Sequence, residues 1–350
     1  MNNTALPYAP HQAQFFERTC FLLTRDPWSI AAWSLEGTEL WRKFFDWHGD
    51  PWSEASPAPS LVVDGQGDAW ISRDHELIRF KPHSVIDVGS PIAAFACLND
   101  GFLVALKRDD MSIARIDLSG RVAWRTKLEK PEEFAAIART HGPMTWEMRL
   151  VRDPIVVGER LAVVGAGDYN GGLSCRFAVD LETGRVLWRT KLAAWSYVTA
   201  VGDSWFLGQQ GYGAFELRRI ARDGSILDRW DSDGYVTALP SGAIHVIELE
   251  NILPSRTHAS ALLPGGIIRR GAHLDEFYTS RPALTADEEL VFWRNGEVQV
   301  IDRELKCRSL AQVASVGPAS TSEMHLDADG TLAFTLASHL WVENTDFRQP

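Results

Sequence analysis

Apolar and polar residues alternate over short stretches along most of the chain, and turn-forming residues separate these stretches. Two of the clearest examples are Ala114–Leu128 (ARIDLSGRVAWRTKL) and Ala178–Leu192 (AVDLETGRVLWRTKL). A period of two places one face of an extended strand against a core. The glycine in the middle of each stretch supplies the positive φ that a tight hairpin turn requires. Each stretch therefore predicts a β-hairpin.

The hairpins share a fixed spacing between the turn glycine and a tryptophan four residues later. The spacing recurs in Gly37/Trp41, Gly120/Trp124 and Gly184/Trp188. A fourth hairpin shifts its aromatic residue to Trp230, after Gly224, and a fifth hairpin, starting at Val298, has neither residue at these places. An indole at a fixed place after a turn can pack between adjacent sheets, so the spacing indicates a repeated packing unit.

Two further short strands precede each hairpin, which makes a unit of four strands, A to D. Eight units are found, with third strands near 30–35, 76–80, 112–118, 175–181, 214–220, 257–262, 297–302 and 339–343. Repeated four-stranded units that cannot bury both faces alone are typical of a β-propeller. We expect an all-β chain that forms one propeller domain over residues 1–350, with eight antiparallel blades rather than seven. Two stacked β-sandwiches would not explain the recurring Gly–Trp spacing.

Two segments depart from this regular pattern. The last unit lacks a fourth strand, and the segment around Gln12–Phe16 could either pair there or form the first strand of the first blade. Residues 129–150 form an insertion in which Pro131 and two acidic residues begin the stretch PEEFAAIART. Proline and acidic residues favour the first turn of a helix, so we expect a short helix near residues 131–140 on one face of the propeller.

Composition limits the compartment and the partner. The chain has 35 Lys and Arg against 46 Asp and Glu, a net charge of −11, which disfavours nucleic acid and anionic membranes as partners. No apolar run reaches the roughly 20 residues that span a bilayer, and no basic and apolar leader begins the chain. The four cysteines lie far apart, which indicates reduced thiols rather than disulfides or a zinc site. We expect a cytoplasmic protein.

One hairpin resembles the repeat of the quinoprotein alcohol-dehydrogenase-like propellers, the pyrroloquinoline-quinone (PQQ)-type repeat. The residues that match its consensus are Asp180, Thr183, Gly184, Arg185 and Trp188. A second hairpin matches with one turn residue deleted, at Asp117, Gly120, Arg121 and Trp124. The resemblance implies the propeller fold. The chain lacks the family's adjacent cysteine pair and a recognisable set of calcium ligands, so we expect neither the quinone nor any other cofactor.

Loop lengths differ between the two faces that propeller topology creates. Loops A–B and C–D are short and lie on what we call the short-turn face, whereas loops B–C and D–A lie on the long-loop face and include 45–59, 129–152, 167–174, 209–213 and 271–282. Loops held by a rigid scaffold often carry binding residues. Aromatic residues gather in or beside the long loops, and they are the predicted binding residues, although single rings could instead fill gaps between blades: Trp47, Trp52, Trp146, Tyr169, Trp195, Tyr212, Tyr235, Phe277 and Tyr278.

Catalytic motifs are scarce. The chain contains no HExxH and no GxSxG, and Asp46, His48 and Asp50 are better explained as a solvated loop than as a metal site. We therefore predict no catalytic or metal-binding residue. The sequence favours a non-catalytic scaffold or inhibitor that binds another protein through aromatic anchors on the long-loop face, and the acidic residues there would suit a partner with a basic patch. The alternative is a hydrolase- or lyase-type enzyme, or a small-molecule binder, that uses Asp168 or Asp275 at the channel mouth.

Overall fold

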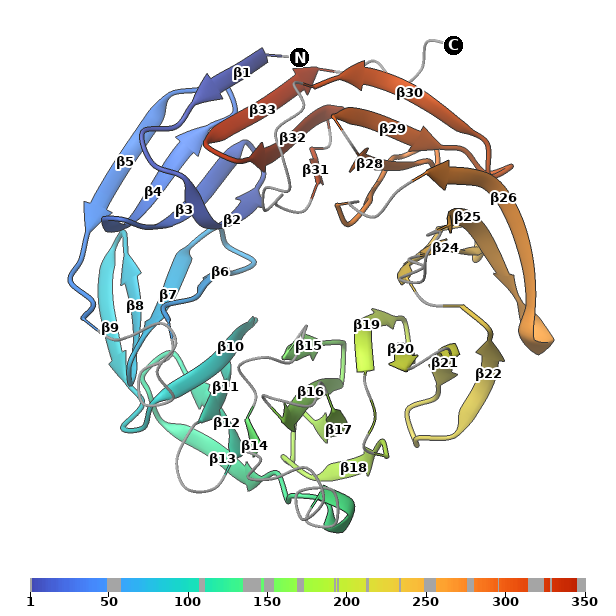
Figure 1. Ribbon diagram of the computed structural model, residues 1–350. Coiled ribbons are helices and arrows are strands. Elements are labelled where there is room, and N and C mark those ends of the chain that lie inside the picture. Colours follow the sequence, from blue (N-terminus) through green and yellow to red (C-terminus); the bar gives the residue numbers. More distant parts are fainter. Residues whose placement is uncertain are drawn as a thin grey trace.

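The computed structural model is an eight-bladed β-propeller of four-stranded antiparallel blades arranged around a central axis, and in blade 4 two short strands share the inner position (Figure 1). This confirms the predicted fold class and the choice of eight blades over seven. The structure describes residues 2–48, 58–106, 111–134, 146–147, 154–168, 173–191, 193, 195–211, 214–232, 234–248, 256–275, 280–294, 296–313, 324–327 and 329–344.

The first four blades follow one another along the chain, each from its inner strand A to its outer strand D. Blade 1 contains β2 (Pro10–Phe16), β3 (Thr19–Arg25), β4 (Trp28–Ser34) and β5 (Glu39–Phe44). Blade 2 contains β6 (Leu61–Val63), β7 (Ala69–Arg73), β8 (Glu76–Phe80) and β9 (His83–Asp87). Blade 3 contains β10 (Ile92–Leu98), β11 (Gly101–Leu106), β12 (Ser112–Asp117) and β13 (Val122–Lys127). Blade 4 contains β14 (Trp146–Glu147), β15 (Ile155–Val157), β16 (Leu161–Asp168), β17 (Ser174–Asp180) and β18 (Val186–Arg189).

The other four blades complete the ring. Blade 5 contains β19 (Trp195–Val201), β20 (Ser204–Gly211), β21 (Ala214–Ile220) and β22 (Ile226–Trp230). Blade 6 contains β23 (Gly234–Ala238), β24 (Ile244–Glu248), β25 (Arg256–Leu263), the 3₁₀ turn η1 (Pro264–Gly266) and β26 (Ile267–Asp275). Blade 7 contains β27 (Ala283–Leu284), β28 (Leu290–Arg294), β29 (Glu297–Ile301) and β30 (Cys307–Gln312). Blade 8 contains β31 (His325–Leu326), β32 (Thr331–Leu336), β33 (His339–Asn344) and β1 (Asn2–Ala5).

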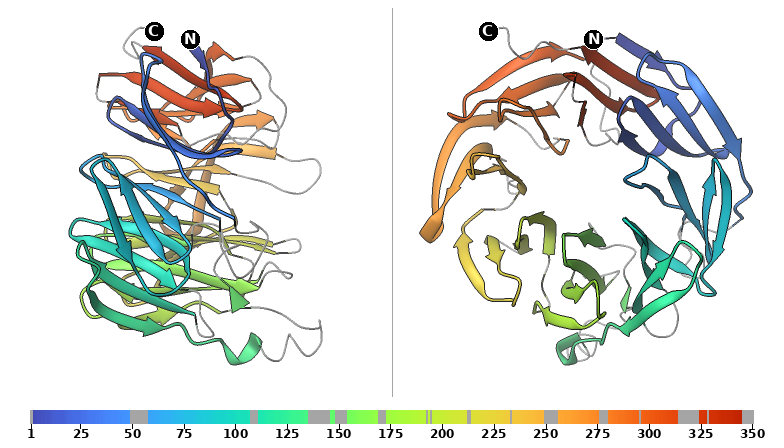
Figure 2. Two further views of the ribbon diagram at one scale, coloured as in Figure 1. Left: turned by 90° about the vertical axis from the view of Figure 1, so that its left-hand side faces the viewer. Right: turned by 180° about the vertical axis from the view of Figure 1, so that it is seen from behind.

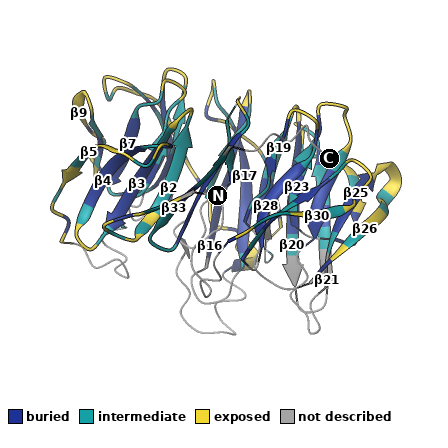
Figure 3. Cartoon of the chain, turned by 90° about the horizontal axis from the view of Figure 1, so that it is seen from above, coloured by how far each residue is buried: buried dark blue, intermediate teal, exposed yellow. Residues whose placement is uncertain are grey.

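Apolar burial is concentrated in the middle strands and between blades. All six residues of β11 are buried, whereas the outer strand β5 has no buried residue. Figure 3 shows buried residues along many strands, in dark blue, and exposed residues in the turns at the strand ends, in yellow. The core clusters join neighbouring blades; one of them brings Leu103 and Ile113 of blade 3 together with Val164 and Phe177 of blade 4. Each blade therefore buries its two faces against its neighbours, as the repeat requires.

The repeated Gly–Trp pair forms a contact from one blade to the next. The indole of Trp124 on the outer strand of blade 3 lies against Gly184 in the C–D turn of blade 4, where an added Cβ would be 2.6 Å from Trp124 Cδ2. Trp188 lies in the same way against Gly224 of blade 5, where a Cβ added to the glycine would be 2.8 Å from the Cβ of Trp188. Each of these two indole N–H groups donates to a backbone carbonyl of the next blade's C–D turn, at 3.1 Å from Trp124 and 3.0 Å from Trp188.

Trp230 extends this contact to the next interface, since its indole N–H donates to the Leu263 carbonyl of blade 6 at 2.9 Å. Trp41 packs against the apolar cluster that joins blades 1 and 2. The four predicted blade-packing tryptophans therefore all lie at inter-blade interfaces.

At the interface between blades 6 and 7 the two residue types change places: the glycine lies on the outer strand and the large residue lies in the C–D turn of the next blade. Gly271 stands on the outer strand of blade 6, and its Cα faces Leu305 in the C–D turn of blade 7, which is 2% exposed. Leu305 has a φ of +67°, in the left-handed region that glycine occupies in the equivalent turns. The leucine side chain therefore fills space that an indole fills elsewhere, although leucine is strained in this conformation.

The ring closes between blades 8 and 1. The first strand, β1, pairs with β33 from Asn2↔Val342 to Ala5↔His339 and supplies the outer strand that blade 8 lacks. The view from behind shows β1 against β33 at this seam (Figure 2). Gln12–Phe16 lies in β2, the inner strand of blade 1, which settles the alternative left open by the sequence.

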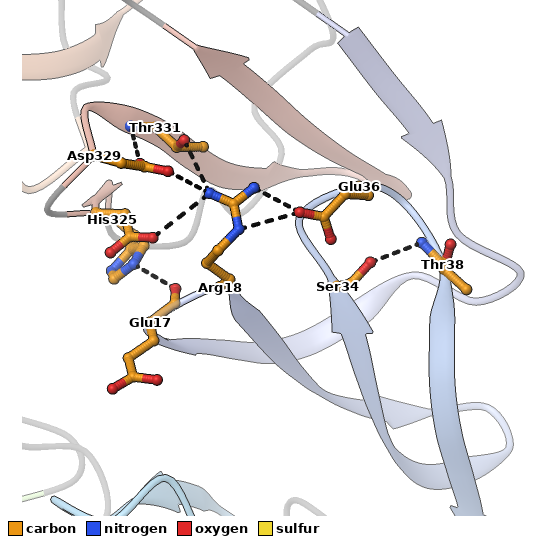
Figure 4. A network of polar contacts seen from close by, with 9 residues as sticks. Glu17, Arg18, Ser34, Glu36, Thr38, His325, Asp329 and Thr331 are labelled. Atoms are coloured by element: carbon orange, nitrogen blue, oxygen red, sulfur yellow. Dashed lines mark hydrogen bonds and ion pairs between the residues drawn. The ribbon is translucent and has the colours of Figure 1, made fainter.

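Side chains of blade 1 also hold the seam on the short-turn face (Figure 4). Arg18 pairs with Glu36 of its own blade at 2.6 Å and with Asp329 of blade 8 at 2.5 Å. The His325 ring stacks on Phe15 with the centroids 5.2 Å apart, and its Nε2 donates to the Glu17 carbonyl at 3.0 Å. Backbone pairing, an ion-pair network and a ring stack therefore join the two ends of the sheet array.

The insertion differs in detail from the prediction. Glu132–Phe134 are helical, and the rest of the expected helix lies outside the described residues. Trp146–Glu147, inside the predicted insertion, form β14, and β14 and β15 share the inner-strand position beside β16. No helix in the described part of the chain is long and apolar enough to cross a membrane.

We predict that Gly184→Ala destabilises the ring more than Gly89→Ala does. Both glycines have a φ near +70°, so both substitutions carry a backbone cost of about 1 to 2 kcal/mol. Only at Gly184 would the new methyl group overlap a neighbour, the Trp124 ring, whereas nothing lies within 4 Å at Gly89. Overpacking should add about 1 to 3 kcal/mol to the loss of unfolding free energy, measured by urea titration. Equal losses in the two variants would contradict the contact.

We also predict that Gly271→Leu and Leu305→Gly partly compensate each other. Leu305→Gly removes a buried side chain and should cost about 2 kcal/mol or more, and Gly271→Leu places a second leucine in the same space. In the double variant the overlap with the Leu305 side chain is gone, although the carbonyl oxygen of residue 305 still lies 2.6 Å from the added Cβ, so the loss of stability should be smaller than the sum of the single losses by about 1 kcal/mol or more. Strictly additive urea-unfolding free energies would show that the two residues do not share this space.

Candidate functional site

The backbone places the described aromatic residues of the predicted binding set at one end of their blades. Trp47 follows β5, Trp146 pairs with Asp168 at the end of β16, and Trp195 and Tyr235 stand at the starts of inner strands β19 and β23. All four positions belong to the long-loop face. Their role in binding stays a prediction. The other five predicted residues lie outside the described residues: Trp52, Tyr169, Tyr212, Phe277 and Tyr278.

Two of these side chains are described, and they differ. Trp47 is 8% exposed and packs edge-on against Trp28, with the ring centroids 5.1 Å apart. It therefore fills space within blade 1, the alternative considered for single rings. Tyr235 is half-buried, and the Arg281 guanidinium lies over its ring at 5.8 Å from the centroid. Arginine over an aromatic face is a favourable arrangement that leaves part of the ring open to solvent.

The carboxylates of the enzymatic alternative stand on different blades. Asp168 ends β16 in blade 4, and Asp275 ends the outer strand β26 of blade 6, with blade 5 between them (Figure 1). Asp46 and His48 are exposed, and Asp50 lies outside the described residues. Among the residues that the structure describes, no three His, Cys, Asp or Glu side chains come together as a metal site.

One hollow formed by described residues lies on the short-turn face, between the turns of blades 3, 4 and 5, and has a volume of about 660 Å³. Four of its charged side chains form ion pairs. Arg115 contacts Asp100 at 2.7 Å and donates to the Leu181 carbonyl at 2.8 Å, and Arg222 lies 3.7 Å from Asp180. Burial raises the pKa of the lining thiol of Cys97 to about 12, so this group is a neutral thiol. The hydrogen bond from Arg115 to Leu181 and the Arg222–Asp180 ion pair tie the turns of neighbouring blades together.

Another hollow lies over the turns of blade 6, between the turns of blades 5 and 7. We call it the blade-6 hollow. Its volume is about 340 Å³, within the range of small-molecule pockets. Its lining includes charged and histidine side chains, namely Arg219, Asp228, His245, Arg269, Glu288 and Arg303. The apolar part of its lining includes Trp230, Leu239, Ile244, Leu262, Leu263 and Pro264.

Glu288 takes an unusual backbone conformation beside this hollow. Its φ is +62°, at the A–B turn position where blades 2, 6 and 8 use Gly67, Gly242 and Gly330. The Glu288 side chain is buried, and it accepts the Ser241 N–H of blade 6 at 2.5 Å and lies 3.2 Å from Arg303 Nε. The hydrogen bond from Ser241 is the main cause that lowers the pKa of Glu288, so the carboxylate stays ionised. The strained residue Glu288 thus places its carboxylate between Ser241 of blade 6 and Arg303 of blade 7.

His245 is the buried histidine of this hollow. It is 2% exposed, and within the described structure its Nδ1 has no hydrogen-bond partner. Burial and then the positive charge of Arg269 lower the pKa of His245, against the smaller opposing effects of Glu288 and Asp302. The imidazole is therefore neutral near pH 7. An unsatisfied polar atom at a buried position marks a place where a bound polar group would gain a hydrogen bond.

Sequence reasoning missed this hollow because its lining comes from three blades. One signal was present: the A–B turn of blade 7 reads TADEE, whereas the corresponding turns DGQGD and DADGT have glycine in the place of Glu288. A glutamate at a position that favours glycine indicates a special role for that side chain.

Comparisons with solved structures agree with the fold. The chain is similar to BamB from Moraxella catarrhalis, with 14% identity, a TM-score of 0.62 and 99% of each chain covered. It is similar to Sqt1 from Saccharomyces cerevisiae, with 11% identity, a TM-score of 0.60 and coverage of 99% of this chain and 100% of the other. The β-propeller domain of Swd1 from Myceliophteria thermophila matches with 10% identity, a TM-score of 0.52 and the same coverage. A scan of protein-family models and a search of curated proteins found no match.

We predict that His245 makes the fold less stable in mild acid. Since its pKa in the folded protein lies below the usual 6.5, the unfolded chain binds the proton more tightly. Well above pH 6.5 the His245 ring is neutral in both states and does not change the free energy of unfolding. As the pH drops below 6.5, the free energy of unfolding falls by at most about 1.4 kcal/mol per pH unit. His245→Gln should flatten the pH dependence of the unfolding free energy between pH 6.5 and the folded-state pKa. An unchanged slope in this variant would contradict the assignment.

Proposed function

We propose that this protein is a non-catalytic β-propeller that binds another protein through its long-loop face, as a scaffold or as an inhibitor. The observation that carries the proposal is that Trp146, Trp195 and Tyr235, from blades 4, 5 and 6, stand at the same end of adjacent blades. Aromatic residues grouped on one face are the usual anchors of protein interfaces. Trp47, which is buried, is left out of the proposed contact surface.

Charge indicates what kind of partner would fit. Asp46, Asp168 and Asp275 stand at the same end of blades 1, 4 and 6 as the aromatic residues. A partner with a basic patch would be drawn to such a face, and opposite charge speeds encounter and disfavours wrong partners more than it adds affinity. Binding should therefore weaken as salt rises.

The repeats and the compartment extend this proposal. The blade-to-blade contact of Trp124 and Trp188 supports blades of the PQQ-repeat type, which here would serve as a scaffold without the family's catalytic features. We place the protein in the cytoplasm, on the basis of its separated cysteines, which in the structure are free thiols at Cys20, Cys97, Cys175 and Cys307.

The enzymatic alternative has less support. Asp275 lies on the outermost strand of its blade, away from the channel, and Asp168 belongs to another blade. The two residues thus belong to different blades and to different strand positions, whereas general acid and base groups must both reach one substrate.

Affinity capture from extracts of the organism that encodes the chain tests the proposal. The wild-type protein should retain a specific partner, and Trp195→Ala and Tyr235→Ala should each reduce retention at least about tenfold, since interface aromatics often contribute 2 kcal/mol or more. Quantitative mass spectrometry of the retained proteins is the measurement.

The matched control is Leu118→Ala, which truncates a 57% exposed apolar side chain on the short-turn face. It should retain the partner as the wild type does. Thermal unfolding of all three variants shows whether the fold survives. Retention that is unchanged in both aromatic variants, or lost equally in the control, would overturn the assignment of the face.

A further inference from the structure

We infer that the blade-6 hollow, on the face opposite the proposed protein-binding surface, binds a small carboxylate that carries an apolar body. The hollow combines a wall of apolar side chains with a guanidinium and a buried imidazole nitrogen that both lack a partner among the described residues. This site is independent of the protein-binding function proposed above, since the two lie on different faces and share no residue.

The charge that would hold the carboxylate comes from Arg269. The other two guanidiniums of the hollow already face carboxylates, with Arg303 Nε 3.2 Å from Glu288 and Arg219 Nη1 3.9 Å from Asp228. Arg269 is exposed, and no carboxylate in the described part of the chain lies within ion-pair distance of it. A guanidinium offers several N–H donors in a plane, which suits both oxygens of a carboxylate.

The two acidic residues of the hollow make it unfavourable for a doubly charged ligand. Glu288 Oε1 accepts the Ser241 N–H, and Asp228 Oδ1 accepts the Gly265 N–H at 3.0 Å, so both carboxylates are fixed by backbone donors. With three arginines and two carboxylates, the hollow has a surplus of one positive charge. A single negative charge balances that surplus, whereas a phosphate dianion would bring a second charge close to Glu288 and Asp228.

The apolar wall selects the rest of the ligand. Trp230, Leu262 and Pro264 line one part of the hollow, and the Trp230 indole N–H is already donated to the Leu263 carbonyl. Trp230 and Leu262 are nearly buried, so the apolar surface open to a ligand comes mainly from Pro264 and from Leu263, which is 39% exposed. An aromatic ring or a branched alkyl chain would bury its surface there.

His245 supplies a polar contact at a buried position. Its neutral ring has an Nδ1 that lacks a partner in the described structure, and the residue lies at the start of β24, directly after the A–B turn. A ligand oxygen or N–H that reaches this nitrogen would satisfy it. Two sources can carry the required chemistry, namely a free small acid and the carboxyl-terminal residue of a polypeptide.

Titration with phenylacetate and its neutral analogue phenylacetamide tests the inference on the intact protein. Phenylacetate should bind with a Kd on the order of 1 mM, the range for a ligand of about ten non-hydrogen atoms, and should shift the NMR signals of the His245 ring. Phenylacetamide and Arg269→Gln should each weaken binding about tenfold or more. The matched control Arg229→Gln removes a 60% exposed guanidinium on the neighbouring strand β22, outside the hollow, and should leave the Kd unchanged.

N-acetyl-leucine, a mimic of a carboxyl-terminal residue, distinguishes the sources. Tighter binding of N-acetyl-leucine than of phenylacetate would support a polypeptide terminus as the ligand, and the reverse would support a free acid. The inference is overturned if phenylacetate does not saturate, if phenylacetamide binds as well, or if Arg269→Gln binds as the wild type does. None of these readouts depends on a protein partner, so failure here leaves the proposed function of the long-loop face untouched.

Discussion

The ring depends on the contact that each outer strand makes with the C–D turn of the next blade. At three successive interfaces a tryptophan of β13, β18 or β22 donates its indole N–H to a carbonyl of that turn. At the first two of these interfaces the tryptophan side chain packs directly on a glycine, since a Cβ added to that glycine would lie 2.6 to 2.8 Å from the tryptophan. The same glycine provides the positive φ that closes the hairpin. One residue therefore serves both the turn within a blade and the packing between blades, which explains why the pair recurs in the sequence.

Most of the fold could be predicted from the sequence because that contact leaves a local pattern. All eight predicted third strands match observed strands, from β4 to β33. Two features could not be predicted for physical reasons. The closing strand Asn2–Ala5 reads NNTA, which has no apolar alternation, and its place is decided by pairing with β33 at the other end of the chain. The two-residue strand β14 is likewise defined by its partner β16, not by its own sequence.

The candidate sites were harder to predict than the fold. Topology correctly assigned Trp146, Trp195 and Tyr235 to one face, since a strand's direction within a blade determines where its ends lie. Exposure was not predictable, because the burial of Trp47 depends on its packing against Trp28. The blade-6 hollow was missed for a related reason: His245 and Arg269 have unremarkable local sequences, and they join Glu288, whose place in a glycine position is the one local signal, only through the packing of neighbouring blades.

The blade-6 hollow adjoins blade 7, which departs from the repeat at two turns. Blade 7 has Leu305 and Glu288 at two turn positions where other blades use glycine, and both residues take the strained left-handed conformation. Leu305 has a packing role, since it fills the gap beside Gly271. Glu288 fixes its carboxylate between Ser241 and Arg303. Departures from a repeat that cost backbone strain persist when the side chain has a task of its own. In this ring the regular interfaces hold the scaffold together, and the irregular one provides the hollow that we assign to a ligand.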